Sequence, residues 1–98
     1  MIYEILQGIG LPVAYGVMRS GQKPPYLSYR GNGQETMAAD DTYVWTHNSY
    51  VIEYYFKLKN EETEASIEQA LMNAGFLYEK SEDIYLEEDG VWMIYYYC

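Results

Sequence analysis

Hydrophobic and polar residues alternate most regularly over residues 50–59. In this segment the residues expected to face a core are Tyr50, Ile52, Tyr54, Phe56 and Leu58, and those expected to face solvent are Val51, Glu53, Tyr55, Lys57 and Lys59. Alternation with a period of two predicts a half-buried β-strand. Shorter runs rich in β-branched and aromatic residues predict further strands over residues 11–18, 26–30, 42–46, 76–80, 84–87 and 91–97. In the first of these, Val13, Tyr15 and Val17 share one face.

Two segments have the spacing of helices instead. Ile2, Ile5, Leu6 and Ile9 form one apolar stripe on a short first helix, which the glycines at positions 8 and 10 would end. A second helix is predicted over residues 61–74, because Asn60 is a favourable N-cap and acidic residues follow it. Gly75 stands at the C′ position of that helix. Its buried stripe would consist of Ile67, Ala70, Leu71 and Ala74.

The connections are predicted from turn residues. Residues 20–25 end in two prolines and read as a turn, as do His47-Asn48-Ser49 and Glu88-Asp89-Gly90. Residues 31–41 have neither the helical nor the strand period and begin Gly-Asn-Gly. We therefore expect an exposed loop there, and a loop of that length in a small domain is either mobile or used for binding.

Together these elements predict an α+β fold with a mainly antiparallel sheet. The expected order is one helix, four strands, a second helix and two or three strands (α-β-β-β-β-α-β-β). Residues 1–98 are expected to form a single domain, since no repeat, low-complexity tract or linker divides them. Thirteen tyrosines favour the same conclusion, because tyrosine packs well on a pleated, half-buried surface.

The net charge of −9 bears on the partners. Residues 1–49 carry three basic and four acidic side chains, whereas residues 50–98 carry three basic and eleven acidic ones. Binding to nucleic acid or to an anionic membrane depends on Lys and Arg, so both are disfavoured. Most of the acidic residues are expected to be solvated and to keep a tyrosine-rich protein soluble.

Cys98 is the one cysteine, so no disulfide can form within the chain. Neither a signal sequence nor an apolar run long enough to cross a bilayer is apparent. A reducing cytosol is the expected compartment.

The candidates for chemistry all have simpler structural interpretations. His47 lies in a predicted turn without a nucleophile or orienting carboxylate, and Cys98 has no rigid setting. The Gly31-Asn-Gly33 sequence lacks the lysine and Ser/Thr of a phosphate-binding loop. The acidic runs 82–83 and 87–89 lack the ligand spacing of a calcium loop. We therefore expect neither an enzyme nor a metal or cofactor site.

Five segments carry a resemblance that spans nearly the whole chain. They are Leu11-Pro-Val-Ala-Tyr-Gly16, Lys23-Pro-Pro-Tyr-Leu-Ser-Tyr29, Gly31-Asn-Gly33, Tyr50-Val-Ile-Glu-Tyr-Tyr-Phe56 and Asn73-Ala-Gly-Phe-Leu-Tyr-Glu-Lys80. In this combination the chain resembles the small neck proteins of siphophages and prophages, of the tail-terminator or head-tail joining type. None of the segments is a reaction signature.

The resemblance implies a structural virion protein, made in the cytoplasm of a bacterial host, with a tail-terminator-like α+β fold. Such a protein forms a ring, expected to be a hexamer, that caps the major tail tube protein and docks it to the head-tail connector. DNA would pass through the ring without being bound specifically. An acidic subunit suits such a pore, because it repels the phosphate backbone.

Contacts between subunits would come from strand edges and from the segment 31–41, including Asn32, Gln34 and Met37. Arg19, Lys23 and Arg30 are the basic side chains expected to face acids of a neighbouring copy, namely Glu61, Glu62 or Glu64. The alternative for all six charged residues is an ordinary solvated surface, where an exposed ion pair contributes only about 0–1 kcal/mol.

Two other classes stay open. One is an acidic binding module that mimics DNA or inhibits a host enzyme: Glu61, Glu64 and Glu68 line up at helical spacing, although Lys57, Lys59 and Lys80 would interrupt the row. The other is a toxin-antitoxin or regulatory partner, for which small size is the only feature.

Overall fold

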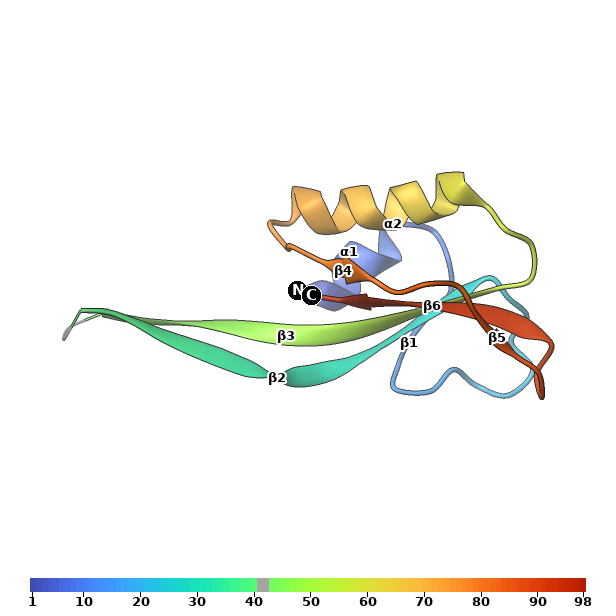
Figure 1. Cartoon of the computed structure of the whole chain (residues 1–98), viewed down its shortest axis with the longest axis horizontal. Coiled ribbons are helices and arrows are strands. Elements are labelled where there is room, and N and C mark those ends of the chain that lie inside the picture. The colour runs from blue at the N-terminus through green and yellow to red at the C-terminus, as the bar shows by residue number, and fades with distance from the viewer. Residues whose placement is uncertain (41–42) are drawn as a thin grey trace.

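A computed structural model describes residues 1–40 and 43–98, with the side chains of residues 39–44 left aside. The molecule is elongated, 52 × 24 × 23 Å, and its two helices lie on the same side of a sheet (Figure 1). In chain order the elements are α1 (Ile2–Gln7), β1 (Val13–Tyr15), β2 (Tyr26–Asp40), β3 (Tyr43–Phe56), α2 (Glu61–Asn73), β4 (Glu79–Lys80), β5 (Ile84–Leu86) and β6 (Val91–Tyr97).

The sheet has the strand order β1-β2-β3-β6-β4, and β5 also pairs with β6. Among the strand pairs of the described residues, β1 and β2 run parallel and the others are antiparallel. The chain thus enters β6, its last strand, between β3 and the short strands β4 and β5. The predicted α+β class with a mainly antiparallel sheet is confirmed.

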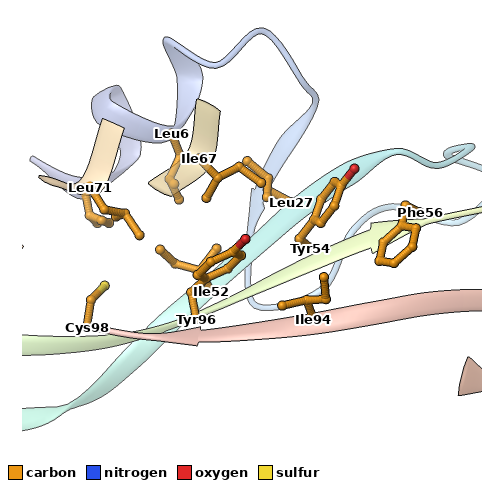
Figure 2. Close-up of a cluster of buried hydrophobic side chains, with 11 residues drawn as sticks. Leu6, Leu27, Ile52, Tyr54, Phe56, Ile67, Leu71, Ile94, Tyr96 and Cys98 are labelled. Carbon is orange, nitrogen blue, oxygen red and sulfur yellow. The ribbon is translucent and has the colours of Figure 1, made fainter. Parts of the chain in front are cut away.

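The hydrophobic core lies between this sheet and the two helices (Figure 2). Ile52 and Tyr54 of β3, with Ile94 and Tyr96 of β6, are at most 1% exposed. The helices supply the opposing side chains, which are Ile2 and Leu6 from α1 and Ile67 and Leu71 from α2. Each fully buried side chain of this size contributes roughly 1.5–3 kcal/mol by leaving water.

Both ends of α2 follow the sequence signals. The Asn60 side chain accepts hydrogen bonds from the backbone N–H groups of Glu62 and Thr63. At the other end Gly75 has φ +87°, a value that glycine adopts without strain, and the N–H of Phe76 donates to the carbonyl oxygen of Leu71 over 2.9 Å. This hydrogen-bond pattern ends the helix and turns Phe76 towards the core.

The predicted alternation of buried and exposed residues is wrong at several positions near the ends of the strands and of α2. Leu58 is 84% exposed, because β3 ends at Phe56, and Val51 is buried although it was assigned to the solvent face. Val17 is 87% exposed, since β1 has only three residues. Ala74 is exposed because it caps α2 and does not face the core.

The strand predicted over residues 76–80 is reduced to the two residues of β4. The last strand, predicted over residues 91–97, is confirmed, and so is the turn before it, where Gly90 has φ +65°. Strong alternation of bulky residues therefore located the central strands, whereas weaker patterns overestimated the edge strands.

The main correction concerns residues 31–49. The expected loop over 31–41 is strand as far as Asp40, and the expected turn at His47-Asn48-Ser49 lies inside β3. The two predicted strands 42–46 and 50–59 are therefore parts of one strand; Asp41 and Thr42 fall outside the described residues. Irregular register between Gly31 and Gln34 interrupts the alternation that would have revealed this hairpin.

Candidate functional site

A long β-hairpin extends beyond the helices and forms the left end of the molecule in Figure 1. We call residues 32–49 the arm. Its two strands pair with each other from Gln34 opposite Asn48 to Asp40 opposite Tyr43. At about 3.3 Å per residue, the stretch from Ser49 to Tyr43 alone spans about 20 Å. No other strand of the described part of the chain pairs with the arm.

Large apolar side chains are exposed on the arm. Met37 lies opposite Trp45 across the hairpin, and these side chains are 52% and 45% exposed. Together with Glu35, His47, Gly75 and Leu77 they line a cavity of about 240 Å³. The exposed face therefore combines an indole and a thioether, two groups frequent in protein interfaces.

The base of the arm is attached to the rest of the molecule by His47. Its Nε2 lies 2.8 Å from the backbone oxygen of Cys98, and its ring meets that of Phe76 edge to face at 6.0 Å. On the arm itself the Gln34 side chain donates to Asn48 Oδ1 over 2.7 Å. His47 is thus a structural residue at the arm base, in β3 and not in a turn.

The opposite end of the molecule has a cleft of about 480 Å³, which we call the polar cleft. It is lined by Gly16, Val17, Met18, Tyr26, Ser28, Arg30, Glu53, Tyr55, Leu86 and Asp89. The cleft belongs to the strands β2 and β3, the segment after β1 and the hairpin that joins β5 to β6.

Glu53 is the centre of the polar cleft. Its carboxylate accepts hydrogen bonds from Ser28 Oγ at 3.3 Å, from Arg30 Nη1 at 2.5 Å and from the hydroxyl of Tyr55. The Glu53 side chain is 14% exposed, so three donors hold a nearly buried charge in place. Arg30 is therefore paired within its own chain.

Two tyrosines form one wall of this cleft. Tyr26 and Tyr55 stack with their ring centres 4.8 Å apart. Burial raises the pKa of Tyr55 above its ordinary value, and the hydrogen bond to Glu53 raises it further. Burial and the negative charges of Asp89 and Glu53 also raise the pKa of Tyr26. Both hydroxyls consequently stay protonated at neutral pH.

A second charged cluster links α2 to the sheet edge. Glu64, only 2% exposed, pairs with Lys59 Nζ at 2.7 Å and with Lys80 Nζ at 2.8 Å. Lys80 also pairs with Glu68 at 2.7 Å, and Glu68 in turn accepts a 2.8 Å hydrogen bond from the buried hydroxyl of Tyr96. Figure 2 shows that tyrosine among the core side chains.

The pKa of Glu64 reflects two opposing influences. Burial alone would raise it, but the hydrogen bonds and positive charges of Lys59 and Lys80 outweigh burial and hold the pKa below its ordinary value. The pKa of Lys80 rises in the same way, because the bonds to Glu64 and Glu68 outweigh its partial burial. Glu64 and Lys80 are therefore both charged at neutral pH, and their ion pairs offset much of that charge.

The nine residues expected at an interface lie in separate places. Arg19 and Lys23 are exposed in the segment before β2, and Glu61 and Glu62 are exposed at the start of α2. Asn32, Gln34 and Met37 lie together on the arm. Glu64 departs from the expectation: it is buried and paired with two lysines of its own chain, which leaves little of its carboxylate for another copy.

The sequence pattern indicates no special role for two prominent residues. It predicts Trp45 as an ordinary strand residue and Glu53 as a solvated one. The available signal for Trp45 was its setting, a large apolar side chain in a stretch without lysine, arginine or proline. Glu53 gave no signal, because its donors Ser28 and Arg30 lie more than twenty residues away in the sequence.

Among the described residues, no three His, Cys, Asp or Glu side chains are placed to hold a metal ion. In the same part of the chain, no helix has the length and apolarity that a membrane span requires.

Comparison with known proteins gives one informative result. No protein-family model and no curated protein matches the chain. Among solved structures, the chain is similar to one from the virion of a native gene transfer agent particle, with a TM-score of 0.61. The likeness is one of fold. Sequence identity is 15%, over 98% of this chain and 87% of the other.

Proposed function

We propose that this protein is a non-enzymatic structural component of a phage-type virion. The observation that carries the proposal is the shared fold with a virion chain, which extends over 98% of the residues and therefore includes the arm as well as the helix-covered sheet. A projecting hairpin with exposed apolar side chains suits a protein that works by contact with its neighbours.

Within the virion we propose the role of a tail terminator or head-tail joining subunit in the neck. Copies would form a ring of six that caps the tail tube and docks it to the head connector. The net charge of −9 supports this role, since an acidic pore lets DNA slide past without binding it. Arg19, Lys23, Glu61 and Glu62 are exposed and available as charged contacts.

The ion pairs of α2 weaken the alternative of a DNA mimic. Such a mimic needs an exposed row of acids, but Glu64 is buried and both Glu64 and Glu68 are neutralised by lysines. Two of the three acids in the helical row are thus removed from the surface charge pattern.

Light scattering coupled to size exclusion tests the proposed function. The protein is run alone and mixed with the tail tube protein encoded in the same genome. We expect a mass near six subunits or co-elution with the tube. A strict monomer that ignores the tube at high concentration would contradict the proposal, and competition with DNA for a DNA-binding enzyme would then favour the mimic.

A further inference from the structure

The arm has the properties of a strand pair that is completed by another molecule. An isolated two-stranded hairpin is at best marginally stable in water. Natural edge strands are normally protected by charged side chains, above all lysine, by proline, by β-bulges or by a covering element. Among these the arm has Glu35 and two irregularities of register. Residues 31–50 contain no lysine, arginine or proline, and the arm extends beyond the helices (Figure 1).

The polar cleft lies at the other end of the same strand. Trp45 on the arm and Tyr55 in the cleft are ten residues apart in β3, which corresponds to about 33 Å of extended chain. Each copy therefore has a projecting apolar group at one end and a cleft at the other. A contact between unlike surfaces of this kind is heterologous, and it closes into a ring when the rotation between copies allows.

The chemistry of the cleft matches that of the arm. Its rim is apolar, with Val17 87% exposed and Met18 and Leu86 beside it, and Tyr26 and Tyr55 form an aromatic wall. Such surfaces favour a thioether and an indole ring, since sulfur and aromatic rings attract each other and aromatic rings stack.

The cleft also offers acceptors for the indole N–H. Asp89 is one of the residues that line the cleft. Glu53 accepts three hydrogen bonds, and a carboxylate has about four acceptor positions. A tryptophan that enters the cleft could therefore bury its ring and still pair its only polar group.

We propose that Met37 and Trp45 of one copy insert into the polar cleft of the next copy. This contact specifies how neighbouring copies join in the proposed ring, and it rests on the proposed function. Its elements are an apolar anchor, an aromatic wall and a partly buried carboxylate that is already held by Ser28, Arg30 and Tyr55.

Disulfide trapping tests the contact directly. One variant carries Met37→Cys and a second carries Val17→Cys; the two are mixed at high concentration, alone and with tail tubes, and then oxidised. The native Cys98 is 9% exposed, and burial raises the pKa of its thiol to about 11, so it should stay silent. We expect a cross-linked dimer that joins the two variants.

The matched control replaces Val17→Cys by Leu58→Cys. Leu58 is 84% exposed and follows β3 at the same end of the molecule, but it lines a different cavity. The proposed contact would be overturned if Met37→Cys cross-links equally well to Val17→Cys and to Leu58→Cys. It would also be overturned if complexes form and no cross-link to Val17→Cys appears. If complexes form on the tube without the Met37–Val17 cross-link, the contact is wrong and the proposed function stands.

A second measurement follows the strength of association. Trp45→Ala should weaken self-association roughly tenfold or more, because a central tryptophan anchor is often a hot spot. Leu58→Ala, which removes a more exposed apolar side chain outside the cleft, should leave association unchanged. If Trp45→Ala has no effect, the arm does not anchor the contact. If association occurs and depends on Trp45 but tail tubes are ignored, the contact stands and the neck function fails.

Discussion

The arm and the rest of the molecule, which we call the body, are built from the same two strands but are stabilised differently. In the body, β2 and β3 lie beneath α1 and α2, and Leu27, Ile52 and Tyr54 are at most 1% exposed. In the described residues of the arm the same strands pair only with each other, and Met37 and Trp45 are about half exposed. The body is therefore stabilised by its own core, whereas the arm exposes apolar side chains that a partner could cover.

One part of the continuous hairpin formed by β2 and β3 therefore serves folding, and the other part serves assembly. Substitutions in the body should change the free energy of unfolding, and substitutions in the arm should change association. Five measurements test this separation, from the largest expected effect on stability to the smallest.

Ile52→Ala should have the largest effect. Ile52 is fully buried at the centre of β3, so its loss removes apolar contacts and leaves a cavity, which destabilises by about 3 kcal/mol. Urea unfolding followed by circular dichroism measures the change. Leu58→Ala, at an exposed position, should stay within about 0.5 kcal/mol of the parent protein. A loss below about 1 kcal/mol for Ile52→Ala would argue against this core.

Glu64→Gln should destabilise by about 1–2 kcal/mol. Removing one charge from a buried ion pair often destabilises a protein by more than this. Here Lys59 and Lys80 are partly exposed, and they still pair with Asp83 and Glu68 respectively. Glu61→Gln on the exposed side of the same helix is the matched control and should be nearly neutral. Equal effects of the two substitutions would mean that burial of Glu64 contributes nothing.

The same pair of variants tests a pH dependence. Because the pKa of Glu64 is lower in the folded than in the unfolded state, its stabilising contribution is present above the unfolded value near 4.5. That contribution is lost as the pH falls from there through the folded value. The parent protein should lose more stability than Glu64→Gln over this acidic range, in urea unfolding at several pH values. Parallel curves would be inconsistent with the lowered pKa.

Asn60→Ala removes the N-cap of α2 and should destabilise by about 1 kcal/mol. The side chain accepts two backbone hydrogen bonds that alanine cannot replace. Thermal unfolding gives the change, with Asn60→Asp as the control that retains an acceptor. If alanine and aspartate behave alike, the cap does not stabilise the helix.

Shortening the arm should have the smallest effect on stability. Replacing residues 36–46 by Asn-Gly keeps Glu35 opposite His47, retains the contact of His47 with Cys98, and removes both Met37 and Trp45. An Asn-Gly pair closes a two-residue hairpin, so the free energy of unfolding should change by less than about 0.5 kcal/mol. Association should be lost in light scattering. Loss of folding would show that the arm belongs to the core.

The parts of the fold that sequence predicted are those where a local pattern and burial agree. Asn60 and Gly75 delimit α2, and the run from Val91 to Tyr97 is strand throughout. The alternation rule failed at Leu58, because the chain leaves the sheet after Phe56 to reach α2. Periodicity alone does not show where a strand ends.

The arm was missed for a physical reason. The side chains of residues 31–38 are exposed and belong to no core cluster. Apolar residues therefore need not alternate along them, and the strand pattern is lacking although β2 extends as far as Asp40. Glu64 was assigned to the surface for a related reason. Most of its neighbours in sequence are polar, and the lysines that pair with it come from positions 59 and 80.

The pairing of basic residues within the chain affects how self-association should depend on ionic strength. Arg30, Lys59 and Lys80, half of the six basic side chains, are already paired with carboxylates of the same chain. Few basic side chains are left to attract the acids of a neighbouring copy, and each copy carries a net charge of −9, so copies that approach each other repel. Salt at about 0.15 M reduces the range of this repulsion to about 8 Å. Self-association that rests on apolar anchors should accordingly become stronger as salt is added, which is the reverse of what is seen when opposite charges hold two proteins together.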